Sequence, residues 1–423
     1  MHAVIVGGGI IGTTTAWQLR QRGADVTVIE QEPDVARATS RGNAGVIAPG
    51  YVTPWAAPGM PFKILKYLFR SASPVIYRPA MNAAQWRWVA RWLRECDLGK
   101  YRVNKARMQR VAYYSKACLD EFRSAHPFDY GRSQGYLQLF RTAFDEDMAR
   151  PAMQMLAEAG INHRLLTADE CLAVEPGLKW AGVRPASGLY LPEDEAGDCA
   201  VFAGRLRGLC ERAGVRFMFD TRVRGLLRSG TDVTGVAVSR GDGADKDNVQ
   251  ADAVIVAAGV HSRRLLAPLG ITVPLYPVKG YSTTLTVTDP GRAPRAALMD
   301  ESLKTAITRM GPRIRVAGTA ELGDDRLAIR QKATRTLIKV LNDWFPGAAD
   351  TSRAEFWVGL RPMTPDGPPL LGKTSSRNLY INLGHGSTGW AMSMGSACVV
   401  ADLVVGKPPD IDLSGLTLER YRH

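Results

Sequence analysis

The chain has 423 residues, of which 45% are hydrophobic and 22% are charged, and its formal net charge is +13. Length and composition are typical of a folded globular protein with about two to three domains. No apolar run reaches the length of a transmembrane helix. The first residues lack the basic flank and cleavage site of a signal peptide, so we expect a cytoplasmic protein.

The cysteines and histidines show no metal-binding pattern. The six cysteines are scattered without a C-x-x-C pair, and no two of the six histidines have H-x-x-x-H spacing. These spacings argue against a zinc site, an iron–sulfur cluster and a disulfide framework. We therefore predict no metal site and a reducing compartment.

The first thirty residues follow the order of a dinucleotide-binding unit. Residues 4–6 and 26–29 are β-branched runs that predict buried strands, and residues 13–22 have the composition of a helix. Residues 7–12, between the first strand and the helix, satisfy G-x-G-x-x-G. A glycine triplet alone is a weak signal, but this context favours a dinucleotide site over a purely structural βαβ unit.

Each residue of the glycine turn has a task in holding a dinucleotide. Gly7 permits a tight turn, Gly9 lets the backbone approach a pyrophosphate, and Gly12 lets helix and strand pack closely. Ile10 and Ile11 complete the motif ahead of the helix, whose unpaired N–H groups attract phosphate.

Polar and small residues follow the second strand. Glu30 lies where an acid accepts hydrogen bonds from a ribose, and Gln31 comes directly after it. The next loop places a hydroxyl, an amide and bare backbone close together, and its alternative interpretation is an ordinary surface loop. From this loop we assign Ser40, Asn43, Ala44 and Gly45 to the cofactor site.

Residues 49–126 change from an extended to a helical pattern. Prolines at positions 49, 54, 58 and 61 predict an extended segment. From residue 62 the pattern is helical, with interruptions near 74–79 and 97–100, and Asn104 is a candidate helix cap.

Much of the excess positive charge lies in this helical region. Residues 62–70 mix apolar side chains with lysine and arginine, and Arg87, Arg91 and Arg94 follow at helical spacing beside several tryptophans. Such helices suit contact with an anionic membrane surface. The alternative is a solvated basic face over an aromatic core. No nucleic-acid-binding module is recognisable, so we expect no nucleic-acid partner.

The central part of the chain alternates strands and helices. Strands are predicted at 135–140, 188–191, 215–219, 222–227 and 233–239, helices at 146–159 and from Asp198 to 212, and a polar turn at 241–247. Runs at 280–287, 304–309 and 313–318 suggest an antiparallel sheet that is distinct from the nucleotide fold. A helix over 325–345 follows.

Small residues recur far from the first glycine turn. Residues 253–256 form a second buried strand that leads into Ala258 and Gly259, and residues 378–383 form a last strand. The segment after it opens a helix that reaches residue 405, and it contains Gly384, Gly386, Thr388 and Gly389. The alternative is that these glycines only allow helices to pack tightly.

This recurrence favours FAD over a nicotinamide cofactor, because a long ligand is touched by distant segments. The helix after Gly384 can direct its positive end at the flavin, where negative charge develops on reduction. We add Val223, in the strand at 222–227, to the cofactor contacts.

The predicted fold class is α/β, and α+β over the whole chain. We expect a Rossmann-type FAD-binding domain from the discontinuous segments 1–60, 190–270 and 350–423. A substrate-binding domain with helices and an antiparallel sheet then comprises residues 61–189 and 271–349.

At this point the chain resembles a known family over essentially its whole length. It is similar to the FAD-dependent D-amino-acid dehydrogenases of the small-subunit type, within the glycine oxidase and D-amino-acid oxidase superfamily. The matching motifs are VIVGGGIIG at 4–12, NAG at 43–45 with PGY at 49–51, PWAAPG at 54–59, YPVKGY at 276–281, GLRPMTPDG at 359–367 and GHG at 384–386. The chain departs from the family at Arg41-Gly42, where an apolar residue and alanine are more frequent, and its substrate preference can differ accordingly.

The resemblance implies oxidation of an amino acid to an imino acid, which water hydrolyses to a 2-oxo acid and ammonia. It also implies that Arg361, between Gly359 and Pro362 in a rigid turn, binds the substrate carboxylate; a structural salt bridge is the alternative. Tyr281 is a second candidate for the carboxylate, against a packing role. His385 is a candidate for contact with flavin or substrate, and Tyr51 for the substrate pocket.

Other activities stay open from the sequence. A dehydrogenase for D-proline or hydroxyproline, an oxidase that uses oxygen, and a non-catalytic flavin subunit that relays electrons are the alternatives. The expected electron acceptor is a quinone or another carrier. The basic region leaves open a peripheral contact with the inner face of the cell membrane.

Overall fold

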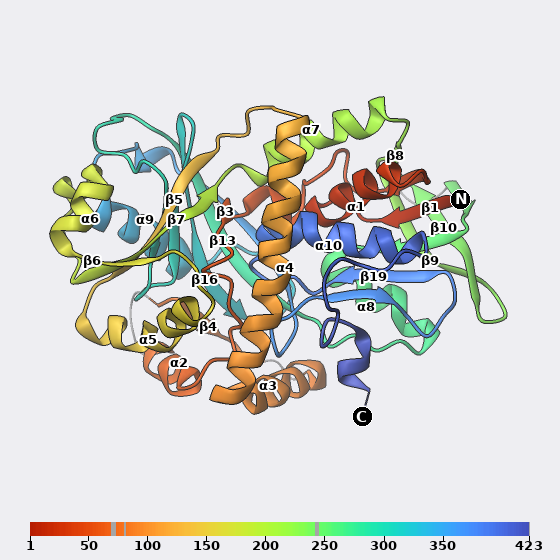
Figure 1. The fold of residues 1–423 in the computed structure, drawn as a ribbon, viewed down its shortest axis with the longest axis horizontal. Helices are drawn as coiled ribbons and strands as arrows, with labels where there is room; N and C mark the ends of the chain where they lie inside the picture. The colour runs from red at the N-terminus through yellow and green to blue at the C-terminus, as the bar shows by residue number, and fades with distance from the viewer. Residues whose placement is uncertain (69–72, 80–81, 242–244, 423) are drawn as a thin grey trace.

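The computed structural model describes residues 1–68, 73–79, 82–241 and 245–422 (Figure 1). Arg70 of the predicted basic region and the centre of the predicted turn at 241–247 lie outside these residues. Both ends of the described chain lie on the side of the molecule that carries the nucleotide fold.

A six-stranded sheet contains the first glycine turn. Its order is β18-β19-β12-β1-β2-β8, and all neighbours are parallel except β18 and β19. The strands are β1 (His2–Val6), β2 (Asp25–Ile29), β8 (Arg216–Met218), β12 (Ala253–Val256), β18 (Leu370–Lys373) and β19 (Leu379–Leu383). Segments from both ends of the chain therefore form one sheet, which confirms the predicted α/β class with a Rossmann-type unit.

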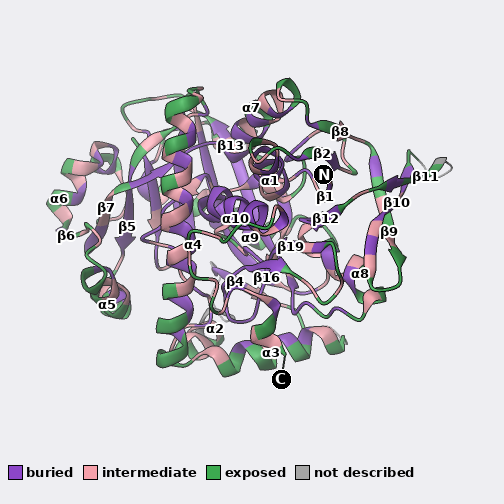
Figure 2. Ribbon diagram, turned by 45° about the vertical axis from the view of Figure 1, so that its right-hand side comes forward, coloured by how far each residue is buried: buried purple, intermediate pink, exposed green. Residues whose placement is uncertain are grey.

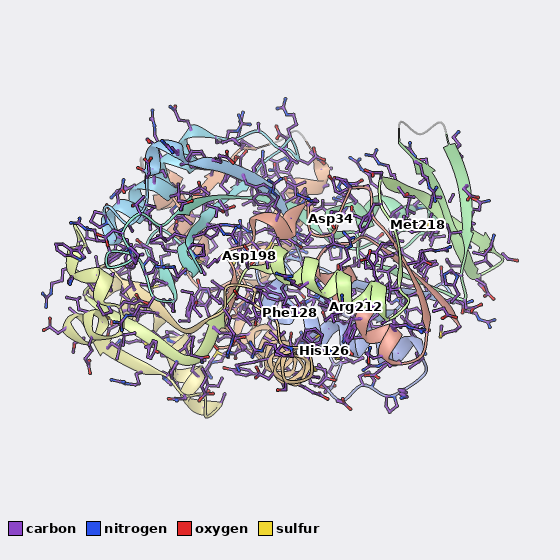
Figure 3. All side chains as sticks on the ribbon, turned by 90° about the horizontal axis from the view of Figure 1, so that it is seen from above. Asp34, His126, Phe128, Asp198, Arg212 and Met218 are labelled. Carbon is purple, nitrogen blue, oxygen red and sulfur yellow. The ribbon has the colours of Figure 1, made fainter. Side chains whose placement is uncertain are left out.

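This sheet is covered on both faces, as a parallel sheet requires. Ala3 and Ile5 face a helical layer formed by α1 (Ile10–Gln21), α7 (Cys199–Arg212) and α10 (Gly389–Val404). Val4 and Val6 face a three-stranded sheet of β9 (Thr221–Ser229), β10 (Asp232–Arg240) and β11 (Asp245–Gln250). Figure 3 shows α7 between Asp198 and Arg212, and Asp198 caps it as predicted, accepting hydrogen bonds from the N–H groups of residues 200 and 201.

Helix α10 is the central helix of the molecule and is buried along almost its whole length (Figure 2). It packs against α1 on one side and against α4 (Leu98–Ala125) on the other. We expected this helix to open at Gly384, but it begins at Gly389. Gly384 and Gly386 have φ values of 76° and 55°, which form a turn instead of a helix.

The second large sheet has ten strands. Eight follow the order β17-β13-β16-β15-β14-β5-β7-β3, with β4 beside β16 and β6 beside β7. The strands are β3 (Val46–Ile47), β4 (Val75–Tyr77), β5 (Ser133–Phe140), β6 (Arg164–Thr167), β7 (Ser187–Ala196), β13 (Tyr276–Thr286), β14 (Ala297–Asp300), β15 (Thr305–Met310), β16 (Arg313–Leu322) and β17 (Glu355–Met363). The sheet is mixed and not purely antiparallel as expected, because β14 pairs with β5, and β16 with β4, in parallel.

Two of these strands come from ranges that we predicted for the FAD-binding domain. Strand β3 lies within 1–60 and β17 within 350–423, but both pair in the ten-stranded sheet. The predicted domain boundaries stay a prediction.

The two faces of the ten-stranded sheet differ in chemistry. One face is apolar and packs against α9 (Gln331–Trp344), with Leu137, Leu139, Leu298, Ile307, Val316 and Tyr281 among its side chains. The strand register places polar side chains on the opposite face, among them Tyr136, Gln138, Thr308, Arg315, Ser282 and Arg361. A polar inner face needs partners, and it is therefore where we look for a ligand.

Around the ten-stranded sheet lie α2 (Met60–Leu68), α3 (Ala83–Glu95), α5 (Ala143–Glu158) and α6 (Ala168–Val174). Helix α8 (Ser262–Leu266) lies on the nucleotide-fold side, against β9. Short 3₁₀ turns are η1 (Thr39–Gly42), η2 (Pro176–Trp180), η3 (Gly259–His261), η4 (Ala267–Leu269), η5 (Thr351–Arg353) and η6 (Leu418–Tyr421). Two predicted helix starts are wrong: α9 begins at Gln331 and not at 325, and α4 begins at Leu98 with Asp97 as its cap, so that Asn104 is a buried residue inside it.

No helix in the described ranges is both long enough and apolar enough to cross a membrane.

Candidate active site

The glycine turn lies where β1 meets α1. Gly7 has a φ of 108°, and a methyl group on it would lie 2.7 Å from the carbonyl oxygen of Ala257. A methyl group on Gly12 would overlap the carbonyl of Gly7. The Ile10 N–H at the start of α1 donates to Ser40 Oγ at 3.1 Å. The turn therefore has the close packing and the open backbone that a pyrophosphate needs.

Glu30 lies at the end of β2, next to this turn. Its Oε2 accepts a hydrogen bond from the Gly8 N–H at 2.5 Å, and its Oε1 accepts one from the Glu32 N–H at 3.0 Å. Burial raises the pKa of the Glu30 carboxyl above its usual range, although these two hydrogen bonds oppose the shift. The neighbouring Gln31 is exposed.

Ala258 and Gly259 follow β12, the strand beside β1. Val223 lies in β9, close to Glu30, because the Thr221 N–H donates to the Glu30 carbonyl at 3.0 Å. The glycine turn, Glu30, Ala258 and Gly259 thus lie together at the carboxyl ends of β1, β2 and β12, with Val223 close by.

The loop after β2 joins this edge to the ten-stranded sheet. Thr39 Oγ1 donates to the Leu360 carbonyl at 2.9 Å, and Asn43 Oδ1 accepts from the Gly45 N–H at 2.8 Å. Arg315 donates to the carbonyls of Arg41 and Asn43, each at 2.9 Å. Ala44 lies between these anchored positions, so the backbone of residues 39–45 is held at both ends.

A second loop meets the end of β17. The Gly386 N–H donates to the Pro362 carbonyl at 3.2 Å, and His385 pairs with Met363 in an isolated bridge. Thr388 is the cap position of α10 and Gly389 its first residue. The positive end of a buried helix therefore faces the region beside β17.

His385 is only 3% exposed. Its Nε2 lies 3.0 Å from Ser396 Oγ. Burial lowers the pKa of its imidazole to about 3, so the ring is neutral at physiological pH.

Arg361 lies in β17, and not in the rigid turn that we expected. It is half-buried, and its guanidinium lies against Gly280. Among the described residues, its hydrogen-bond acceptors are all backbone carbonyls, those of Lys279 at 3.2 Å, Thr319 at 3.4 Å and Gly318 at 3.5 Å.

Burial is the sole cause that lowers the pKa of Arg361 to about 10, because no carboxylate among the described residues acts on it. A desolvated cation without an anion is costly and attracts one. This observation distinguishes Arg361 from an arginine in a structural salt bridge.

Two further features surround the guanidinium. The Trp55 ring lies 5.8 Å from Arg361 Cζ, and its Nε1 donates to Ser387 Oγ at 3.3 Å, which links the loop at 384–389 to Arg361. Thr319 is an extra residue in β16, at a bulge opposite Gly280 and Tyr281, and its φ is 44°. This conformation is uncommon for a β-branched residue, and the bulge presents two carbonyls to Arg361.

Tyr281 and Tyr51 are not brought to Arg361. The Tyr281 hydroxyl donates to Glu321, and its side chain lies on the opposite, apolar face of the sheet. Tyr51 packs on Tyr136, with ring centroids 5.1 Å apart, and burial raises its pKa to about 12. Tyr136 lies in β5, five strands from β17 in the sheet order. Because side chains alternate between the two faces of a strand, the sequence could have shown that Tyr281 lies on the other face from Val278 and Gly280. It has no signal for the distance between Tyr51 and Arg361.

The polar face also contains groups that our sequence analysis missed. Thr308 Oγ1, Arg315 Nε and Thr319 Oγ1 are buried without a hydrogen-bond partner in the described part of the chain. Buried polar atoms are normally paired. Unpaired groups beside the two anchored loops fit a bound cofactor with many polar atoms, such as FAD.

The comparisons with known proteins agree with this geometry. The family model described as FAD dependent oxidoreductase matches residues 2–403. The chain belongs to this family. It is therefore an oxidoreductase with FAD as its cofactor.

Individual relatives cover the whole chain. A D-amino acid dehydrogenase of Cereibacter sphaeroides is 46% identical over 100% of this chain and 95% of its own length, and one of Bradyrhizobium diazoefficiens is 45% identical over 100% and 99%. Among solved structures, glycine oxidase from Geobacillus kaustophilus has a TM-score of 0.74 at 23% identity and covers 98% of this chain and 97% of its own. That likeness shows a shared fold.

Proposed function

We propose that the chain oxidises D-amino acids to 2-oxo acids and ammonia and passes the electrons to an acceptor other than oxygen. The observation that carries the proposal is the half-buried Arg361, which has no anionic partner among the residues that the structure describes. The names of full-length relatives at 45–46% identity support the D-amino acid as substrate.

Arg361 binds and orients the substrate in this proposal. Its planar guanidinium can form two parallel hydrogen bonds with a carboxylate. The carbonyls of Lys279, Gly318 and Thr319 hold the guanidinium in place, and Trp55 covers it. FAD, held by the glycine turn at residues 7–12 and the loops at 39–45 and 384–389, would supply the hydride-accepting chemistry. The chain's main contribution is to position the α-carbon, for which no general base is required if the amine is neutral.

His385 has a supporting role in the proposal. Its buried imidazole is neutral, so it adds no positive charge beside the substrate. It fixes the loop between β19 and α10 through Ser396 and Met363. We therefore place it as a positioning residue at the flavin end. Tyr281 and Tyr51 have structural roles.

The experiment that tests the proposal is anaerobic bleaching of the bound flavin. The wild-type chain is mixed with D-alanine, L-alanine and D-proline, and the flavin absorption is followed. We expect bleaching by a D-amino acid and none by its L-isomer. Bleaching by the L-isomer alone would overturn the proposed handedness, and faster bleaching by D-proline than D-alanine would favour the proline dehydrogenase.

Arg361→Ala should keep the flavin but lose its reduction. Hydrogen bonds to a charged group contribute about 1.5–3 kcal/mol each, so kcat/KM should fall by at least about a hundredfold. Arg353→Ala is the matched control, because that arginine is 89% exposed and lies just before the same strand. Normal bleaching of Arg361→Ala would contradict the assignment.

We also propose a membrane quinone as acceptor, reached through a basic and apolar surface. This α2–α3 surface is defined by the exposed side chains Phe62, Leu65, Trp86, Leu93, Leu98 and Val103, with Arg87, Arg91 and Arg94 beside them. Phe62 is 76% exposed and Trp86 52%. Helices α2 and α3 and the start of α4 lie together at one end of the molecule in Figure 1. Exposed apolar residues among arginines support contact with anionic lipid.

A further inference from the structure

The indole ring of Trp357 lies in a slot made by two glycines. Trp357 is half-buried in β17, on the same face of the sheet as Gly359 and Arg361. A methyl group on Gly42 would overlap one edge of its six-membered ring, and a methyl group on Gly359 would overlap the other edge. The ring therefore fills the space of two absent side chains.

The slot lies between the cofactor loop and the substrate strand. Gly42 is the last residue of η1, where Ser40 accepts from the N–H at the start of α1 and Thr39 donates to Leu360. Gly359, on the other side of the ring, is two residues before Arg361. One rigid ring thus separates the segment that touches the phosphate-binding turn from the strand that carries the carboxylate-binding arginine.

Hydrogen bonds from Thr39 to Leu360 and from Arg315 to Arg41 also join η1 to this sheet, but the indole is the bulky side chain at this level. The residues in register with Trp357 on the neighbouring strands are Ser282, Ala317 and Ala306, which are all small. A close-packed interior transmits a change of even one methyl group. The position of η1 relative to β17 consequently depends on the size of the indole and on the missing side chain at Gly42.

We propose that Trp357 is a positioning residue that sets the spacing between η1 and β17, and thereby the position of Arg361 relative to the bound FAD. The inference rests on the proposed function where it is tested by the KM for D-alanine. Its test by the Kd of FAD is independent of that function. Alanine at position 42 is incompatible with the ring as it lies here.

The test inserts the missing methyl group and then makes room for it. Gly42→Ala, Trp357→Phe and the double variant are compared for KM and kcat with D-alanine, and for the Kd of FAD by titration of the apoprotein. The backbone of Gly42 is helical, so alanine introduces overlap without a forbidden conformation. We expect Gly42→Ala to raise both the KM and the Kd roughly ten-fold, which is the size of a typical over-packing cost. The double variant should return both to within about three-fold of wild type.

Gly204→Ala is the matched control. Gly204 is exposed in α7 with no atom within 4 Å of an added methyl group, so neither constant should change. Unchanged KM and Kd in Gly42→Ala would overturn the inference. So would a defect in Gly42→Ala that Trp357→Phe does not relieve, or a lower melting temperature with both constants intact. If wild type fails to reduce its flavin with D-alanine, the proposed function fails, while the FAD titration still decides the role of the slot.

Discussion

At the scale of single residues, charge balance distinguishes function from structure. In the described part of the chain, Arg361 has carbonyl acceptors and no anionic partner. Lys279, on the other face of the same sheet, is 0% exposed and pairs with Glu321 at 2.8 Å and with Asp324 at 3.1 Å. Lys279 and Arg361 are both cations within family motifs that fold as strands, so the sequence does not distinguish their roles. Only their partners show that one is available to a ligand.

Tyr281 gives a residue-scale prediction that separates the two faces. Tyr281→Phe removes the hydroxyl that donates to the buried Glu321 carboxylate, so the free energy of unfolding should fall by about 1.5–3 kcal/mol. The KM for D-alanine should stay unchanged, because Arg361 lies on the opposite face. Urea unfolding and steady-state kinetics measure the two effects. A raised KM with unchanged stability would restore Tyr281 to the substrate site.

At the scale of elements, helix ends were the weakest part of the sequence analysis. The interruption predicted at 97–100 is only the two residues Cys96 and Asp97 between α3 and α4, and Asp97 caps α4 by accepting from the Lys100 N–H at 3.0 Å. Asn104 belongs to the buried face of the same helix, where Arg107 donates to its side chain at 3.0 Å. A polar residue before an apolar run has the same appearance at a cap and on a buried helix face.

The cap makes an element-scale prediction. Asp97→Ala should lower the free energy of unfolding by about 0.5–2 kcal/mol, because the first turn of α4 loses a side-chain acceptor. Asp97→Asn is the control, since asparagine caps about as well as aspartate. Thermal unfolding monitored by circular dichroism compares the three chains. Equal melting temperatures for the alanine and asparagine variants would contradict the cap.

At the scale of the whole molecule, the candidate active site and the α2–α3 surface proposed for membrane contact lie in different parts of the chain's fold. The nucleotide fold and the polar face of the ten-stranded sheet meet at residues 39–45 and 384–389, while the α2–α3 surface lies away from the six-stranded sheet in Figure 1. Trp88 and Trp92 are buried, which fits the aromatic core that was the alternative interpretation of this region. Trp86 and the three arginines are exposed, as membrane contact requires.

This arrangement predicts salt-sensitive binding to anionic vesicles. Wild-type binding should weaken as salt is added, because the attraction between exposed charges and lipid is screened over about 10 Å at 0.1 M salt. Arg87→Glu with Arg91→Glu should abolish co-sedimentation even at low salt, because two charges that attract anionic lipid are reversed. Lys332→Glu with Arg335→Glu, two exposed positions of α9, is the control with a matched charge change. Wild-type binding that ignores both salt and the arginine variants would exclude the α2–α3 surface as the contact.

The sequence by itself determined the local parts of this protein: the strand–glycine–helix unit, the glycine loops, the Asp198 cap and the family motif that contains Arg361. These depend on neighbouring residues, such as a φ that only glycine adopts readily or a cap within three positions of its N–H group. The tertiary structure alone decided which side chains share a face. The Thr319 bulge, the opposite placement of Tyr281 and Arg361, and the Trp357 slot all arise from contacts between residues that are 37 or more positions apart. A residue pattern with period two cannot specify which strand lies beside it, because pairing is set by packing of the whole sheet.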